Sequence, residues 1–452
     1  MNTCSRQSRK RSQTRERSFD GGGGEHVRRH STTGIRAVAL KWRYRSSVAG
    51  IQWPVLPSRR GAGLMAALQQ LEDSQWWPEA KLREHQYDQL ETLLAHAYRT
   101  VPHYRQAWRA FGGAPRPGTD AWLRLPLLTR HDLNDGWKNL ISAAIPSSHG
   151  RAQVVRTSGS TGVRATTLTT DITRFFWDVF TLRDHAWHER DFSGKLSIVR
   201  HLTKDKAIYP NVMDVDGWGC AAGELVEMGP ARLINILSPM RQIARWLAHE
   251  NPDYLLIYPS ALDELLRRSS EFDVSLPALR EIRTLSEVVM PETRSASFAQ
   301  WGAKVVDLYS TIEAGYIALQ CPDHPHYHVQ SEGVVAEILN EEGEPCKPGE
   351  IGRVVITSLH NYATPLVRYE LGDMAVAGAT CPCGRGLPVI ERILGRYRNL
   401  LTLPNGERFY PEFTFSPYSG ELPVEQMQVV QTGAKDIEVR IVLDRELTMS
   451  LR

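Results

Sequence analysis

The distribution of apolar residues predicts helices in the part of the chain between residues 75 and 142. Its clearest segment repeats apolar side chains at the spacing of one helix face: Leu90, Leu93, Leu94, Ala97, Tyr98 and Val101. Pro102 ends this run, because proline has no amide hydrogen and its ring clashes with the preceding turn. We therefore expect an amphipathic helix packed against a larger body.

Between residues 151 and 307, short apolar runs alternate with segments of helical periodicity. Val154–Val155, Leu196–Val199 and Tyr254–Tyr258 have the pattern of strands, whereas Met240–His249 and Ala261–Arg268 have that of helices. A strand, a crossover helix and a further strand in succession favour a parallel sheet covered by helices on both faces. The predicted fold class is α/β.

The pattern changes after Tyr309. Val334–Leu339 and Arg353–Leu359 are predicted strands joined by the turn-rich segment EEGEPCKPGEIG, which indicates an antiparallel, barrel-like part. A boundary follows near Gly395. We predict a disordered basic arm over residues 1–64 and a large N-terminal domain over 65–394, with mixed sheets, helices and the barrel-like part. A hinge and a small, truncated α+β C-terminal domain would occupy 395–452.

The composition is that of a soluble, folded protein. Of its 452 residues, 42% are apolar and 23% are charged, and the mean hydropathy is −0.35. No apolar run approaches the length of a membrane-spanning helix, so we expect no membrane partner.

The net charge of +3 is unevenly distributed. Residues 1–50 hold twelve Lys and Arg against three Asp and Glu, a charge of +9, which leaves −6 for the rest. A nucleic-acid partner is not expected, because binding phosphates needs a basic face on the folded body. The arm lacks the apolar stretch of a signal peptide, which predicts a cytoplasmic protein. It is either a start that precedes a real one at Met65 or a basic arm for an acidic partner.

A Gly/Ser/Thr loop, TSGSTG at residues 157–162, follows the predicted strand at Val154–Val155. Glycines allow close approach of the backbone to a ligand, and hydroxyls and amides can point at phosphate oxygens. An ordinary linker has the same composition, and no lysine follows in the P-loop pattern. The loop alone therefore leaves a nucleotide cradle and a linker both open.

Three further segments follow in order. Tyr309 and Glu313 lie four residues apart after an apolar strand, and they offer a ring for a purine and a carboxylate for Mg²⁺. Asp373, at a turn, offers an acceptor for two ribose hydroxyls, and Arg396 offers a cation at the interdomain joint. Each alone could be a core tyrosine, an ion pair or a loop residue. Their combination favours a nucleotide site.

In this order, TSGSTG, YSTIEAG, RYELGD and GRYRN resemble the adenylate-forming superfamily, specifically its phenylacetate-coenzyme A ligase-like branch. Upstream, HAYRTVPHYRQAW and LPLLTRHDL are similar to the N-terminal helices of that branch. The resemblance spans roughly residues 75 to 410.

The resemblance implies a two-step ligase that uses ATP, Mg²⁺ and coenzyme A. A small carboxylic acid, of a phenylacetate-like aryl type, would form an acyl-adenylate, and a thiol would then displace AMP. Among the implied roles, Tyr309 stacks on adenine with Ser310 beside it, Asp373 binds the ribose, and Thr161, Glu313 and Arg396 take part in catalysis. The remaining implied nucleotide contacts come from the loop and from an LSEVV segment: Ser158, Gly159, Ser160, Gly162, Ser286 and Glu287.

The chain departs from the family pattern at several positions. Val163 and Arg164 follow the loop, Ile312 stands where threonine is common, and Asn399 stands where the hinge is commonly aspartate. The most serious departure is that the family's C-terminal lysine, in a Gly-Lys context, has no counterpart here. Its loss predicts a rate lower by about a hundredfold or more. A nucleotide-binding protein with little turnover, an amide-forming relative and an adenylyl-transferring relative therefore stay open, as does a homodimer.

A structural zinc site is the last prediction. Cys381 and Cys383 place two thiolates on a tight turn, and Cys321 follows the tyrosine motif with histidines close behind. Cys321, Cys381, Cys383 and one imidazole, for which we choose His328, would complete a tetrahedral Cys₃His site. Unligated thiols are the alternative.

Overall fold

The computed structural model describes residues 42–156, 165–203, 206–219, 221–396, 401–406, 408–409 and 424–443. The first of these ranges is mainly helical, as expected from its apolar spacing. Its helices are α1 (Arg59–Ser74), α2 (Glu79–Thr100), α3 (Pro102–Ala107), α4 (Asp120–Leu123) and α5 (Arg130–Asp135). Helix α2 ends directly before Val101 and Pro102, as predicted, and its apolar face is buried.

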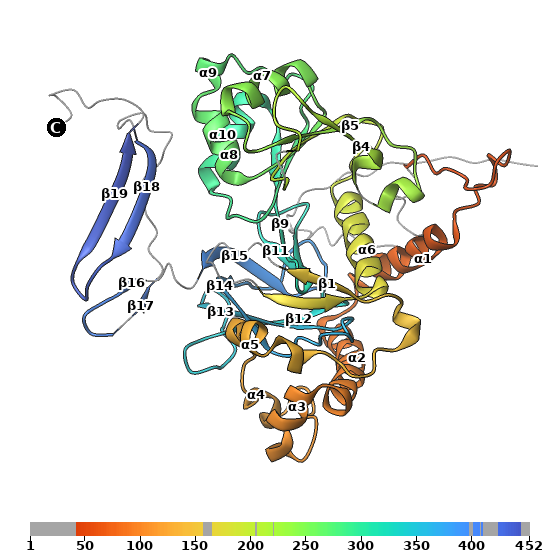
Figure 1. The fold of residues 1–452 in the computed structure, drawn as a ribbon, viewed down its shortest axis with the longest axis vertical. Coiled ribbons are helices and arrows are strands. Elements are labelled where there is room, and N and C mark those ends of the chain that lie inside the picture. The colour runs from red at the N-terminus through yellow and green to blue at the C-terminus, as the bar shows by residue number, and fades with distance from the viewer. Residues whose placement is uncertain are drawn as a thin grey trace, which may run out of the picture. The chain divides into compact units, whose positions relative to one another are not determined.

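The predicted parallel sheet is present, with six strands in the order β4-β5-β3-β6-β7-β8. Figure 1 labels two of its strands, β4 and β5. All its neighbours are parallel except β4 and β5. The strands are β3 (Leu196–Arg200), β4 (Met213–Val215), β5 (Ala231–Asn235), β6 (Tyr254–Ile257), β7 (Glu281–Thr284) and β8 (Lys304–Val306). The helices between or after them are α7 (Met240–Glu250), α8 (Pro259–Arg267), α9 (Ser269–Phe272) and α10 (Pro291–Trp301).

Successive residues of β3 show why helices cover both faces of this sheet. Val199 joins the core formed with α7, α8 and α10, whereas Leu196 and Ile198 join the core formed with α1 and α6 (Asp171–Trp187). Side chains of a strand point alternately to its two faces, so both faces of a buried strand need cover. This confirms the predicted α/β class.

The barrel-like part is an antiparallel sheet of seven strands in the order β12-β13-β14-β15-β11-β10-β9. It includes the tyrosine motif, because β9 and β10 belong to it. Its strands are β9 (Leu308–Thr311), β10 (Gly315–Gln320), β11 (Tyr327–Val329), β12 (Val334–Leu339), β13 (Ile351–Ser358), β14 (Tyr369–Ala377) and β15 (Val389–Arg396). One face packs with α2 and α3 in a third core.

The remaining strands of the described residues form three two-stranded sheets. Antiparallel β1 (Gln153–Arg156) and β2 (Thr166–Thr169) flank the Gly/Ser/Thr loop. After the boundary near Gly395, β16 (Leu401–Thr402) pairs with β17 (Arg408–Phe409), and β18 (Val424–Gln431) pairs with β19 (Ile437–Leu443). The described residues after 396 contain strands and no helix.

The end of the basic arm differs from expectation. The structure describes residues 42–58, and α1 begins at Arg59, before the expected boundary at residue 64. Trp42 is buried against Phe192, with ring centroids 4.9 Å apart, and Tyr44 forms a bridge with Val226. These contacts join residues far apart in the sequence, so no local sequence pattern predicts them. Among the described residues, no helix is both long and apolar enough to cross a bilayer.

Candidate functional site

Tyr309 and Asp373 meet beside the carboxyl ends of the parallel strands, where α/β folds bind ligands. The chain leaves β8 at Val306 and enters β9, where Tyr309 is buried. The Tyr309 hydroxyl donates a hydrogen bond to Asp373 Oδ2 at 2.8 Å. Because β9 and β14 are not neighbours in the seven-stranded sheet, curling of the sheet brings these two side chains together.

Arg396 completes a group that we call the Asp373 cluster: Tyr309, Asp373 and Arg396. The register of β14 and β15 places Arg396 opposite Asp373, and Arg396 Nε lies 3.2 Å from Asp373 Oδ1. Burial raises the pKa of Asp373, although Arg396 and the Tyr309 hydrogen bond oppose this. Burial and the adjacent Asp373 carboxylate raise the pKa of Tyr309 well above its usual value. Tyr309 therefore acts as a neutral donor to this carboxylate.

Glu313 lies in the turn between β9 and β10 and is buried. Burial raises its pKa, whereas a backbone hydrogen bond and the charges of Arg130 and Arg396 lower it. Arg130, the first residue of α5, is a cation that our sequence reasoning did not assign to this site. The sequence does mark the start of α5 by a capping box, in which the side chains of Thr129 and Asp132 each accept a hydrogen bond from the other's backbone amide. This motif places Arg130 in the first turn of the helix.

The other predicted nucleotide contacts are placed as follows. Ser310 follows Tyr309 on β9 and is half-buried. Ser286 and Glu287 are exposed after the carboxyl end of β7, and Glu287 Oε2 accepts a hydrogen bond from the Ser260 amide at 2.9 Å, near the start of α8. The predicted loop contacts lie outside the described residues: Ser158, Gly159, Ser160, Thr161 and Gly162.

The four predicted metal ligands converge. Cys321 follows β10, and its Sγ lies 3.9 Å from that of Cys381, in the segment after β14. Cys383 Sγ lies 3.4 Å from His328 Nε2. His328 Nδ1 is 3.3 Å from the Leu387 carbonyl oxygen, a contact that suits an Nδ1–H donor and leaves Nε2 facing the thiols.

A second histidine also faces these thiols. Cys321, His326, His328 and Cys381 have ligand atoms within 4.8 Å of one another, and all four residues are buried. His326 Nε2 has no hydrogen-bond partner among the described residues. Burial raises the pKa of the Cys381 thiol to about 12, so a thiolate there needs a nearby cation. The donor set suits a soft divalent cation such as Zn²⁺.

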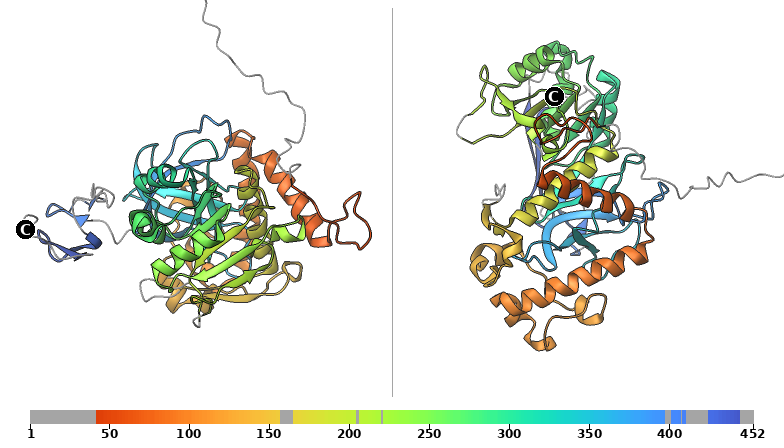
Figure 2. Two further views of the ribbon diagram at one scale, coloured as in Figure 1. Left: turned by 90° about the horizontal axis from the view of Figure 1, so that it is seen from above. Right: turned by 90° about the vertical axis from the view of Figure 1, so that its right-hand side faces the viewer.

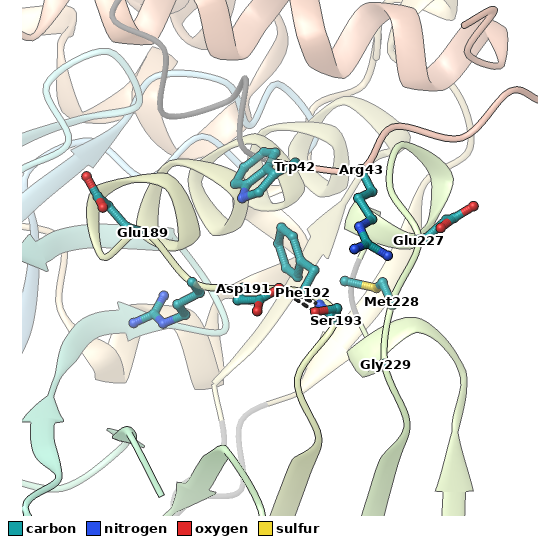
Figure 3. Close-up of a pocket in the computed structure, with 10 residues that line it drawn as sticks. Trp42, Arg43, Glu189, Asp191, Phe192, Ser193, Glu227, Met228 and Gly229 are labelled. Carbon is teal, nitrogen blue, oxygen red and sulfur yellow. Dashed lines mark hydrogen bonds between the residues drawn. The ribbon is translucent and has the colours of Figure 1, made fainter. Parts of the chain in front are cut away.

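A separate cavity of about 500 Å³ lies at the opposite edge of the parallel sheet (Figure 3). Phe192 and Ser193, which precede β3, line it together with Gly229, which precedes β5. Trp42 and Arg43 line another side. These residues lie at the amino ends of the parallel strands, whereas the Asp373 cluster lies beside their carboxyl ends. The cavity is therefore distinct from the Asp373 cluster.

No family model matches the chain, but known enzymes are similar to it in sequence. The phenylacetate-coenzyme A ligase of Thermus thermophilus is 25% identical over 351 residues, 74% of each chain. That of Escherichia coli is 25% identical over 397 residues, 82% of this chain and 84% of the enzyme. The chain resembles the phenylacetate-coenzyme A ligases. This confirms the resemblance expected from the four motifs.

A solved structure has the same fold as this chain. The crystal structure of 2-hydroxyisobutyryl-CoA ligase in the postadenylation state with 2-HIB-AMP matches with a TM-score of 0.64 at 18% identity. The match covers 81% of this chain and 79% of that one. The chain therefore has the fold of this coenzyme A ligase over most of its length.

Proposed function

We propose that the protein is an ATP-dependent acid-thiol ligase that activates a carboxylic acid as an acyl-adenylate. In the first step, a carboxylate oxygen attacks the α-phosphorus of ATP, the bond to the bridging oxygen breaks, and pyrophosphate leaves. In the second, the coenzyme A thiol gives up its proton to solvent, its sulfur attacks the acyl carbonyl carbon, and AMP leaves with the bonding electron pair. The names of the curated relatives support this chemistry, and the Asp373 cluster carries the assignment of the nucleotide site.

Within the proposed site, the Asp373 carboxylate accepts hydrogen bonds from the ribose hydroxyls. The Tyr309 hydroxyl and Arg396 already bond to this carboxylate, which fixes its orientation before the nucleotide arrives. The Tyr309 ring is the proposed stacking partner of adenine, and Arg396 is proposed to add positive charge near the phosphates. Burial of the cluster strengthens each of these interactions, because water screens charges less there.

The charge that develops on the phosphates needs cations and amides around it. Glu313 is the proposed carboxylate ligand of Mg²⁺, and the ion supplies charge neutralisation when it is bound with ATP. A buried carboxylate with a raised pKa suits this role, since a divalent cation would favour its ionised form. The Gly/Ser/Thr loop, including Thr161, is proposed to surround the phosphates.

The proposed function is tested by pyrophosphate release from ATP with a panel of aryl and aliphatic acids, with and without coenzyme A. We expect acid-dependent release and a thioester product. Asp373→Asn should raise the KM for ATP about tenfold or more, because the ribose loses a charged acceptor. The control Glu370→Gln changes a neighbouring carboxylate on β14 that pairs with Arg353, and its KM should stay near that of the parent.

The same assay separates the finer alternatives. A phenylacetate-like aryl acid is the proposed substrate class. Product formation with amines in place of coenzyme A would favour an amide-forming relative, and transfer of AMP to a coenzyme would favour an adenylyl-transferring one. Retained ATP binding with no pyrophosphate release across the panel would refute the ligase proposal and favour a nucleotide-binding protein with little turnover.

We also propose a structural Zn²⁺ site at Cys321, His328, Cys381 and Cys383. The distances between these side chains support it, and the ion would connect the end of β10 to the segment between β14 and β15. With all four positions taken by protein ligands, the ion would stabilise the fold and leave no position for substrate. His326 is the alternative imidazole, because its Nε2 lies within the same group.

Metal analysis of the purified chain tests this proposal. We expect about one zinc per chain, lost in Cys381→Ser and Cys383→Ser and retained in the control Cys346→Ser, whose thiol lies apart from the group. His328→Ala and His326→Ala should identify the imidazole, since only the ligand's loss weakens zinc retention against a chelator. A parent protein free of zinc after expression with added zinc would refute the site.

A further inference from the structure

The loop between Arg45 and Arg59 has an unusual composition for an exposed segment. Its thirteen residues, SSVAGIQWPVLPS at 46–58, include no charged side chain. Several of its apolar side chains are largely exposed: Val48 (46%), Ile51 (40%), Trp53 (86%) and Leu56 (48%). Figure 2 shows this red-orange segment at the edge of the body beyond α1.

The folded body holds the loop in place at both ends. On the N-terminal side, Trp42 is buried and the Arg45 amide donates to the Leu225 carbonyl at 2.9 Å. The Ser47 amide donates to the Leu56 carbonyl at 2.8 Å, which closes the loop on itself. On the C-terminal side, Ser58 caps α1 by accepting from the Gly61 amide. The apolar side chains are therefore presented by a closed, anchored loop.

The charges at the ends of the loop indicate what covers it. Arg45 and Arg59 flank the uncharged segment, both are exposed, and neither has a carboxylate within ion-pair distance among the described residues. Arg60, by contrast, pairs with Asp178 and Glu224. An apolar tip between two open cations complements the boundary of an anionic bilayer, where acyl chains lie below a layer of phosphates.

We propose that residues 46–58 attach the protein to the surface of membranes that contain anionic phospholipid. Trp53 and its apolar neighbours enter the headgroup and acyl boundary, the depth at which tryptophan is enriched in membrane proteins. Arg45 and Arg59 meet the lipid phosphates. Exposed apolar side chains on a loop flanked by cations favour a lipid surface over a folded protein. This interfacial attachment would involve no spanning helix.

Binding of the full chain to vesicles tests the proposal. The probes are vesicles of phosphatidylcholine alone and of phosphatidylcholine mixed with phosphatidylglycerol, separated by sedimentation. We expect binding to the mixed vesicles that weakens with salt. Trp53→Ser should lower the affinity about tenfold, since one large apolar side chain no longer enters the bilayer. Arg45→Gln and Arg59→Gln should each lower it about fivefold.

Two controls separate the loop from the rest of the chain. Phe298→Ser removes another exposed apolar side chain, 67% exposed on α10, and should leave vesicle binding unchanged. Trp53→Phe keeps an apolar ring, so it should bind but lose the part of the tryptophan fluorescence that brominated lipids quench. Equal binding by the parent and Trp53→Ser, or no binding by the parent, would overturn the proposal. So would self-association that Trp53→Ser abolishes in vesicle-free solution, because a second copy would then cover the loop.

Discussion

The hydrogen bond from Tyr309 to Asp373 allows a quantitative test of the buried cluster. Tyr309→Phe keeps the ring in the core but removes the donor that lies 2.8 Å from Asp373 Oδ2. A hydrogen bond to a charged group contributes about 1.5–3 kcal/mol. Asp373 is only 8% exposed, so water does not easily replace the lost donor, although Arg396 remains beside it. We therefore expect Tyr309→Phe to lower the free energy of unfolding by about 1.5–3 kcal/mol near neutral pH.

The effect should depend on pH in a defined direction. Burial raises the pKa of Asp373 above its ordinary value, so the folded protein holds this proton more tightly than the unfolded chain does. The stability that protonation provides is present at low pH and is lost as the pH rises through the raised pKa. The Tyr309 hydroxyl favours the ionised carboxylate. Its removal should therefore cost most above that pKa and least below it.

A double-mutant cycle of Tyr309→Phe and Asp373→Asn isolates this interaction. Urea unfolding at neutral and mildly acidic pH gives each free energy, provided that the slopes with denaturant stay constant. We expect a coupling of about 1 kcal/mol or more at neutral pH, since a neutral amide accepts roughly half as strongly as a carboxylate. Tyr98→Phe, in a half-buried tyrosine against the same core, is the control. A coupling that is near zero, or unchanged by acid, would refute the reasoning.

Two further predictions concern Asp307 and Gly386. Burial raises the pKa of Asp307 to about 6, so stability should fall by about 3 kcal/mol as the pH rises from the range of a free aspartate through 6. Asp307→Asn should flatten that pH dependence in urea unfolding, and an unchanged profile would exclude Asp307 as its source. Gly386→Ala should lower the melting temperature, because its Cβ would overlap the Trp77 carbonyl oxygen. Gly63→Ala, in α1 with ordinary contacts, should raise the melting temperature or leave it unchanged, and equal losses in both variants would contradict this account.

Local patterns in the sequence predicted several elements of the large domain. Helix α2 ends just before Pro102, because proline has no amide hydrogen and its ring clashes with the preceding turn. Strand β12 spans Val334–Leu339, as its apolar residues indicated. Helix α1 begins at Arg59, inside the arm predicted over residues 1–64, because its apolar residues start directly after a segment with the composition of a linker. The order of four motifs was enough to indicate the ligase-like fold.

The sequence by itself determined periodicity, charge and the presence of Tyr309, Asp373 and the thiols. Only the tertiary structure decided that Tyr309 reaches Asp373 across non-adjacent strands, that Arg130 shares their electrostatic surroundings, and that Cys321 lies beside Cys381. It also decided that Trp53 stands exposed on an anchored loop. The physical reason is that helix and strand preferences act over a few residues, whereas these contacts depend on sheet curl and on packing between segments far apart in the chain.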